Sequence, residues 1–263
     1  MNLHFLIIDP QNDFANPKGN LFVPGADKDL ERLVILLKRH LTQVNAIHVT
    51  LDTHHWVDIA HPIFWVDNQG YSPKPFTIIT EESVLTGQWQ TRQPHCQARA
   101  MAYVKALKAN GRYQLTIWPP HCLIGKPGHN VVTPLAEILT EWENTFAMVD
   151  YVSKGLNHWT EHYSAVKAEI PDPDDSSTLL NTRLINELKL ADLIVCSGQA
   201  LSHCVANTLR DIAANLGQEN ISKLVLIEDT TSPVPGFEEL AQQFLVTMTA
   251  QGMRTVKSTE FLV

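Results

Sequence analysis

The sequence predicts an α/β fold in three layers, in which a central, mostly parallel sheet of about six strands lies between two layers of helices. Short runs of apolar and β-branched residues alternate with longer segments whose apolar residues recur at helical spacing. The short runs are nearly continuous, which is typical of strands buried on both faces of a parallel sheet. Glycines that can cap a helix follow several of the helical segments: Gly111, Gly217 and Gly252.

The expected strands and helices alternate along the chain. The strands are expected at residues 3–9, 46–51, 113–118, 147–152, 193–197 and 224–228. The helices are expected at residues 26–41, 97–110, 131–143, 178–190, 201–216 and 236–250. In the first helix one face is apolar: Leu30, Leu33, Val34, Leu37 and Leu41. In sheets of this kind the ligand site lies beyond the carboxyl ends of the strands, so polar residues that close the strands are the candidates for chemistry.

Residues 53–114 form a connection that is long for a single link between two strands. The segment contains proline, aromatic and polar clusters and one expected helix. We interpret it as an insertion over the active-site face of one domain that spans residues 1–263, and not as a second domain.

Composition and charge narrow the class of protein. The 263 residues are 44% hydrophobic and 18% charged, which is ordinary for a globular protein, and the net charge of −8 disfavours a nucleic-acid or anionic-membrane partner. The N-terminal apolar run is short, follows no basic segment and ends at Asp9, so it predicts neither a signal peptide nor a membrane span. The four cysteines form no CxxC pair, which favours reduced thiols and a cytoplasmic location.

Cys204 lies where an expected strand gives way to a helix. Gly198 allows a tight turn, and a helix that begins near Leu201 or Ser202 places Cys204 in its first turn. The free N–H groups and positive partial charge of a helix N-terminus would lower the pKa of this thiol and could hold an oxyanion. A buried, inert cysteine is the alternative, as we expect for Cys196.

Asp9 and Lys154 also close expected strands, so both should lie at the same edge of the sheet. A carboxylate beside the thiol could take its proton and return it to a leaving amine, and a lysine beside both would favour their charged forms. Each residue has an ordinary alternative. Asp9 can cap the turn that contains Asn12 and Asp13, and Lys154 can be solvated at a strand end.

Asp52, His54 and His121 form a candidate metal site. In an extended segment Asp52 and His54 point to the same side, and His121 follows the next expected strand. An Asp-x-His pair with a remote histidine suits a divalent metal ion that keeps positions open for water. The chain has 12 histidines, so a chance cluster is the alternative, with His121 packed in its proline-rich turn.

Five motifs occur in order along nearly the whole chain. They are LIIDPQNDF at the first expected strand, TLDTHH after the second, WPPHCLIG after the third, VSKG after the fourth and GQALSHCVANT after the fifth. The ordered set resembles the nicotinamidase branch of the isochorismatase-like cysteine hydrolases, which implies a Rossmann-like αβα fold. The resemblance implies a catalytic triad of Asp9, Lys154 and Cys204. It also implies an oxyanion hole made by the N–H groups of Ala200 and Cys204, with a cis peptide bond between Gln199 and Ala200.

The resemblance also implies residues for a cofactor and a substrate. A divalent metal ion, with zinc expected and iron or manganese as alternatives, would be held by Asp52, His54 and His121. His61 corresponds to a fourth ligand in some family members, and His55 is another option in this chain. The aromatic residues that correspond to the substrate pocket are Phe14, Trp118 and Tyr163.

The implied activity is hydrolysis of a small, nicotinamide-like carboxamide to the acid and ammonia through a cysteine thioester, by a homodimer or larger homo-oligomer. Residues 53–114, and the spacing from Lys154 to Tyr163, are longer than in small nicotinamidases. These differences leave other substrates open: another amide, a carbamoyl group or an isochorismate-like vinyl ether. A catalytically silent binding subunit, with the insertion as its partner surface, is the alternative from a different class of protein.

Overall fold

A six-stranded, all-parallel sheet forms the centre of the computed structural model, which describes residues 1–262. The order of the strands across the sheet is β10-β9-β8-β1-β2-β7. Their bounds are β1 (Leu3–Ile8), β2 (Val44–Asp52), β7 (Asp150–Lys154), β8 (Leu193–Gly198), β9 (Leu224–Ile227) and β10 (Arg254–Val256). The sequence-based expectation of a parallel sheet of about six strands is confirmed.

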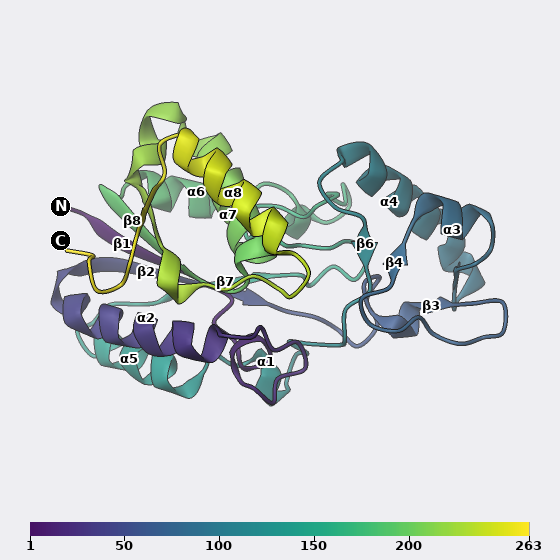
Figure 1. The fold of residues 1–263 in the computed structure, drawn as a ribbon, viewed down its shortest axis with the longest axis horizontal. Helices are drawn as coiled ribbons and strands as arrows, with labels where there is room; N and C mark the ends of the chain where they lie inside the picture. Colours follow the sequence, from purple (N-terminus) through teal and green to yellow (C-terminus); the bar gives the residue numbers. More distant parts are fainter. Residues whose placement is uncertain (263) are drawn as a thin grey trace.

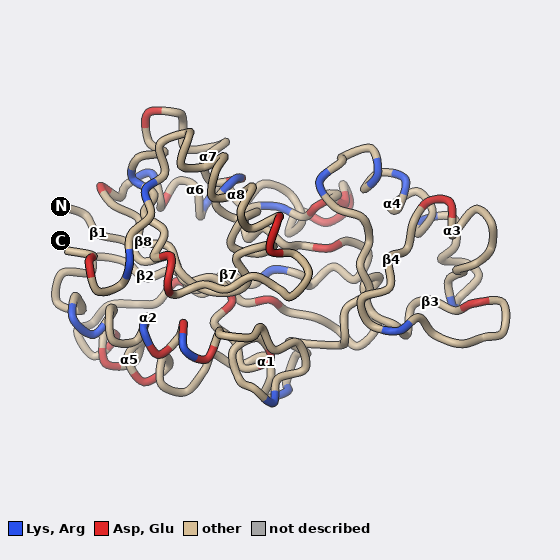
Figure 2. Tube along the Cα trace, viewed as in Figure 1, with Lys and Arg blue, Asp and Glu red and all other residues tan. Residues whose placement is uncertain are grey.

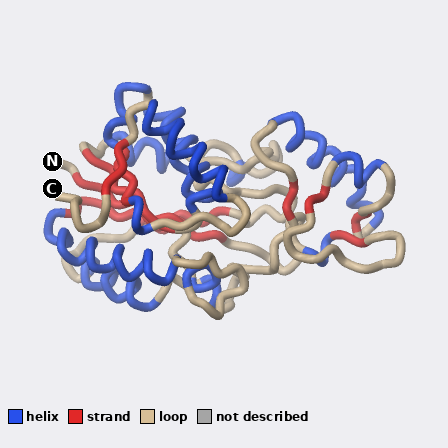
Figure 3. Tube along the Cα trace, in the orientation of Figure 1, coloured by secondary structure: helices blue, strands red, loops and turns tan. Residues whose placement is uncertain are grey.

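Helices cover both faces of this sheet (Figures 1 and 3). One face carries α2 (Ala26–His40) and α5 (Thr133–Glu143), and the other carries α6 (Thr182–Lys189), α7 (Ala206–Leu216) and α8 (Glu238–Ala250). The expected helices therefore form, with ends that differ by a few residues. In α2, acidic residues in the first turn and basic residues in the last turn complement the helix dipole.

Strand β1 lies inside the sheet, between β2 and β8. All six of its residues are buried, because each face of the strand packs against a layer of helices. Burial of one large aliphatic side chain contributes about 1.5–3 kcal/mol, so this apolar run fixes the position of the strand. Asp9, which follows directly, is therefore held at the carboxyl edge of the sheet.

Residues 113–118 do not form a strand of the main sheet, so this part of the prediction is wrong. Only β6 (Leu115–Thr116) is extended there, and it pairs antiparallel with β4 (Ile78–Ile79). The two prolines that follow at 119 and 120 have no N–H to donate to a ladder. The sixth strand is instead β10, which the sequence does not reveal, because none of its three residues is fully buried and no apolar run marks it.

The segment between β2 and β7 carries small elements beyond the carboxyl end of the sheet (Figure 1). They are β3 (Trp65–Val66), paired antiparallel with β5 (Gln90–Thr91), the β4–β6 pair, α3 (Glu81–Leu85) and α4 (Gln97–Asn110). A short helix, α1 (Asn12–Ala15), follows β1 at the same end. Acidic and basic residues are interspersed along the chain (Figure 2). None of the helices within residues 1–262 is long and apolar enough to cross a membrane.

Gly198 brings β8 close to β1. Its φ is +119°, and a Cβ atom placed there would lie 1.9 Å from the Ile8 carbonyl oxygen. We expect Gly198→Ala to lower the free energy of unfolding by more than about 4 kcal/mol, because backbone atoms block the new methyl group. Gly111→Ala is the control: its φ is +69° but nothing lies within 4 Å, so the expected loss is only about 1–2 kcal/mol. Urea denaturation measures both, and equal losses would contradict the packing account.

Candidate active site

Asp9, Lys154 and Cys204 meet at the carboxyl edge of the sheet. Lys154 Nζ lies 3.0 Å from Asp9 Oδ2 and 3.6 Å from Cys204 Sγ. Lys154 ends β7 and Asp9 follows β1, while Cys204 lies in a helical turn after β8. All three side chains are buried. The parallel sheet thus brings together three residues that are far apart in the sequence, and Lys154 contacts both of the others.

Asp9 follows the last residue of β1 and has a left-handed backbone conformation. Its φ is +46°, and its N–H donates to both the carbonyl oxygen and the side-chain oxygen of Thr50, at 3.1 and 3.0 Å. The Thr50 hydroxyl donates in return to Asp9 Oδ1. These contacts orient Oδ2 toward Lys154.

Cys204 lies in a π-helical turn, Leu201–Val205, that precedes α7. Val205 N–H donates to Ala200 O at 3.1 Å, which closes the wide turn. The peptide bond between Gln199 and Ala200 is cis. Within residues 1–262 the N–H of Ala200 has no hydrogen-bond acceptor, and Ala200 and Cys204 both line a cavity. The turn therefore leaves a backbone donor free beside the thiol.

The electrostatics of the thiol differ from the expectation based on a helix N-terminus. Burial raises the pKa of Cys204 well above its ordinary value; Lys154 opposes this shift, while Asp9 and Asp52 add to it. Burial also raises the pKa of Asp9, and Lys154 partly offsets it. Burial alone would lower the pKa of Lys154, but Asp52 and Asp9 outweigh it and hold that pKa well above its ordinary value. The resting site thus favours a protonated thiol beside an ion pair.

Asp52, His54 and His121 form the one group of three or more potential ligands that lies within metal-binding range among the described residues. Their ligand atoms all lie within 4.8 Å of one another. The Nε2 atoms of His54 and His121 lie 3.1 and 3.2 Å from Asp52 Oδ2. His54 Nδ1 bonds to Asp58 Oδ2 at 2.9 Å, and His121 Nδ1 bonds to the Pro119 carbonyl oxygen at 2.9 Å. Such outer partners orient histidine ligands in metal sites, so the donor set fits a divalent ion.

His61 lies beside this group, with its ring 5.2 Å from that of His54 and 5.7 Å from that of His121. Its Nε2 is buried and has no hydrogen-bond partner among the described residues. Burial lowers the pKa of His61 to about 4, which keeps the imidazole in the neutral form that binds metals. His55, the other histidine considered, is exposed.

Asp52 connects the candidate metal site with Asp9, Lys154 and Cys204. Its Oδ1 accepts a hydrogen bond from Lys154 Nζ at 2.9 Å, while Oδ2 faces the two histidines. Burial alone would raise the pKa of Asp52, but His54 and Lys154 hold it well below the ordinary range. The ionised Asp52 carboxylate therefore bonds both to Lys154 and to the two histidines.

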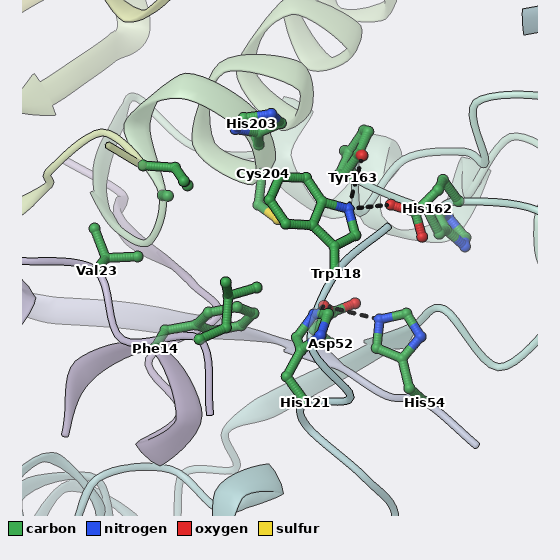
Figure 4. Close-up of a pocket in the computed structure, with 14 residues that line it drawn as sticks. Phe14, Val23, Asp52, His54, Trp118, His121, His162, Tyr163, His203 and Cys204 are labelled. Atoms are coloured by element: carbon green, nitrogen blue, oxygen red, sulfur yellow. Dashed lines mark hydrogen bonds and ion pairs between the residues drawn. The ribbon is translucent and has the colours of Figure 1, made fainter. Parts of the chain in front are cut away.

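A cavity opens between the thiol and the candidate metal site (Figure 4). Phe14, Trp118 and Tyr163 all line it, as do the side chains of Cys204 and Asp52. Other lining residues were not anticipated from the sequence: Leu21, Val23, Glu161, His162, His203 and Val234. Most of these lie in loops or turns, where no periodic pattern reveals which way a side chain points.

Two of the buried acids on the loop after β7 are Glu161 and Glu169. Burial raises the pKa of Glu161 to about 8 and that of Glu169 to about 7. Glu161 lines the cavity, whereas Glu169 does not, and both oxygens of Glu169 are buried without a partner among the described residues. Neither residue carried a recognisable signal in the sequence.

Several solved structures of similar fold are nicotinamidases or pyrazinamidases. The yeast nicotinamidase is 20% identical, with a TM-score of 0.67 over 97% of this chain and 99% of that one. The Acinetobacter baumanii nicotinamidase pyrazinamidase is 22% identical, with a TM-score of 0.67 over 99% and 98%. The Pyrococcus horikoshii pyrazinamidase, solved in complex with zinc, is 18% identical, with a TM-score of 0.59 over 98% and 99%.

The chain has the isochorismatase-like αβα fold. No family model matches the sequence, and a search of the curated proteins found no match. At 18–22% identity the likeness to the neighbours named above establishes the fold, and the chemistry has to be argued from the residues of this chain.

Asp58 tests whether the histidine group binds a metal. We expect Asp58→Asn to weaken zinc binding about 10–100-fold, because His54 loses the carboxylate that orients its ring. Asp150→Asn is a matched control, since Asp150 holds His48 Nδ1 at 2.8 Å on another part of the sheet and should leave the affinity unchanged. Competition with a chromophoric chelator measures both, and equal affinities for the two variants would contradict the assignment.

Glu169 gives a pH-dependent prediction. Its pKa is raised from 4.5 to about 7 in the folded protein, so the folded state loses stability as the pH rises through this range. Glu169→Gln removes the titration, and the stability of the variant relative to the wild type should increase by about 2 kcal/mol between pH 5 and pH 8. Urea denaturation at the two pH values measures the difference, and parallel pH profiles would refute the prediction.

Proposed function

We propose that the protein is an amidohydrolase that cleaves a small, nicotinamide-like carboxamide to the acid and ammonia. The observation that carries the proposal is the position of Lys154 Nζ, 3.0 Å from Asp9 and 3.6 Å from Cys204, where Cys204 lines a cavity. A thiol, a proton acceptor and a fixed positive charge are the groups that acyl transfer through a cysteine requires. A binding site alone would not need them together.

In the first half of the reaction, Asp9 takes the proton of the Cys204 thiol as sulfur attacks the carbonyl carbon of the substrate. The carbonyl oxygen becomes an oxyanion, which the N–H groups of Ala200 and Cys204 would stabilise. The C–N bond then breaks, Asp9 returns the proton to the leaving nitrogen, and ammonia departs. The acyl group remains on Cys204 as a thioester.

In the second half, Asp9 takes a proton from a water molecule, and the water oxygen attacks the thioester carbon. The C–S bond breaks, the acid product forms, and the proton passes to the sulfur to restore the thiol. Lys154 keeps a positive charge beside both proton-transfer partners throughout, which lowers the free energy of each anionic state.

Asp52, His54 and His121 would hold a divalent metal ion, and His61 would supply a fourth ligand. When bound, such an ion supplies a Lewis acid that can polarise a substrate group or a water molecule. The side chains themselves close one end of the cavity, so they set the distance from Cys204 at which a polar end of the substrate can lie.

The aromatic residues favour a flat ring as the body of the substrate. Phe14, Trp118 and Tyr163 line the cavity, and the Trp118 and Tyr163 rings meet edge to face with centroids 6.4 Å apart. Such walls bind planar rings through stacking and edge contacts. We also propose that residues 53–114 are an insertion into a single hydrolase domain, since His54 at their start lines the cavity and the small elements that follow lie beyond the carboxyl end of the sheet.

Cys204→Ala tests the nucleophile. We expect release of ammonia from nicotinamide to fall at least about 1,000-fold, because no other group at the site can form the acyl intermediate. Cys196→Ala is the matched control: Cys196 is a buried thiol on β8 outside the cavity, and its loss should leave the activity per folded molecule unchanged. A coupled ammonia assay measures both, and normal turnover by the Cys204 variant would exclude the scheme.

A further inference from the structure

Glu161 is a buried carboxyl group in the wall of the cavity, with 4% of its surface exposed. Its Oε2 accepts a hydrogen bond from Trp118 Nε1 at 3.1 Å, and the same indole N–H lies 3.1 Å from the Tyr163 hydroxyl oxygen. Figure 4 shows the nitrogen of the Trp118 indole directed toward Tyr163. The indole therefore anchors one oxygen of the carboxyl group and leaves the other to be explained.

Oε1 of Glu161 has no such anchor. No short hydrogen bond to Oε1 is present among the described residues, and no lysine or arginine forms an ion pair with Glu161, although the Tyr163 hydroxyl also bonds to this carboxyl group and lowers its pKa. Oε1 is not sealed from solvent and Glu161 lines the cavity, so this oxygen can be reached from the cavity. A carboxyl oxygen that faces a ligand cavity without a protein partner is available to a ligand.

We propose that Glu161 determines specificity by accepting, through Oε1, a hydrogen bond from a donor group at the end of the substrate remote from the scissile carboxamide. This inference rests on the proposed function, because it requires an amide whose carbonyl carbon lies at Cys204. It narrows the substrate class to ring carboxamides that carry an amino or hydroxyl group.

A donor on the substrate fits this position better than an acceptor does. A carboxyl oxygen keeps a lone pair whether the group is ionised or neutral, whereas only the neutral acid can donate. A substrate donor is thus satisfied in either protonation state. A methyl group in the same place would leave Oε1 unpaired when the ligand closes the cavity, and an unpaired buried polar group weakens binding.

Binding to the Cys204→Ala protein tests the inference without turnover. The probes are nicotinamides with either an amino or a methyl group at ring position 5 or 6, away from the carboxamide, and the two groups have similar sizes. Calorimetry should show, for at least one position, that the amino compound binds about tenfold more tightly than the methyl compound. Adding Glu161→Leu should bring this ratio to about one, while Glu161→Gln, which keeps an acceptor oxygen, should retain part of it.

Glu169→Gln is the matched control. Glu169 is a buried glutamate on the same loop, and its N–H donates to the Glu161 carbonyl oxygen at 2.8 Å, but its side chain lies outside the cavity. This variant should keep the full amino-to-methyl ratio. The same ratio with Glu161 present and with Glu161→Leu would overturn the inference, as would a failure of all four compounds to bind.

A separate assay distinguishes this inference from the proposed function. Release of ammonia from nicotinamide by the unmodified protein, without any amino preference in binding, would overturn the role of Glu161 alone. An amino preference that depends on Glu161, without release of ammonia from any of the compounds, would overturn the proposed hydrolysis alone.

Discussion

A single buried ammonium group joins the two halves of the site. Lys154 Nζ lies 3.0 Å from Asp9 and 2.9 Å from Asp52, and its side chain is 1% exposed. Two carboxylates this close to each other could not both stay ionised in a buried setting without a positive charge between them. The parallel pairing of β2 with β7 places Asp52 directly opposite Lys154. The register of β2 and β7 therefore places the lysine between Asp9 and Asp52, on which both the Cys204 site and the histidine site depend.

The sequence predicts the parallel sheet and the helices well, because buried strands and amphipathic helices each have their own periodicity. Helix α4 begins and ends at the residues predicted, and Gly111 has the left-handed conformation of a C-terminal cap. The prediction for residues 113–118 is wrong because an apolar run does not indicate which sheet a strand belongs to. β10 is missed for the opposite reason, since an exposed edge strand needs no apolar run.

The candidate site is predictable where residues close strands, as with Asp9, Asp52 and Lys154. It is less predictable where loops return to the cavity, as with Glu161, because loop side chains follow no period. The pKa of Cys204 shows a further limit: a helix N-terminus is visible in sequence, whereas the degree of burial and the nearby Asp9 and Asp52 carboxylates depend on the folded chain.

The turn before Cys204 is held from several directions. The Gln199 side chain donates to Asp29 on α2 at 2.9 Å and accepts from the N–H of Ser232 at 3.3 Å, and Gln199 N–H donates to the Ile8 carbonyl oxygen at 2.8 Å. The backbone donors beside the thiol are consequently preorganised by folding, before any ligand arrives. Negative charge that develops beside these N–H groups is stabilised by dipoles that are already oriented. Little free energy is therefore spent on reorganising solvent or backbone.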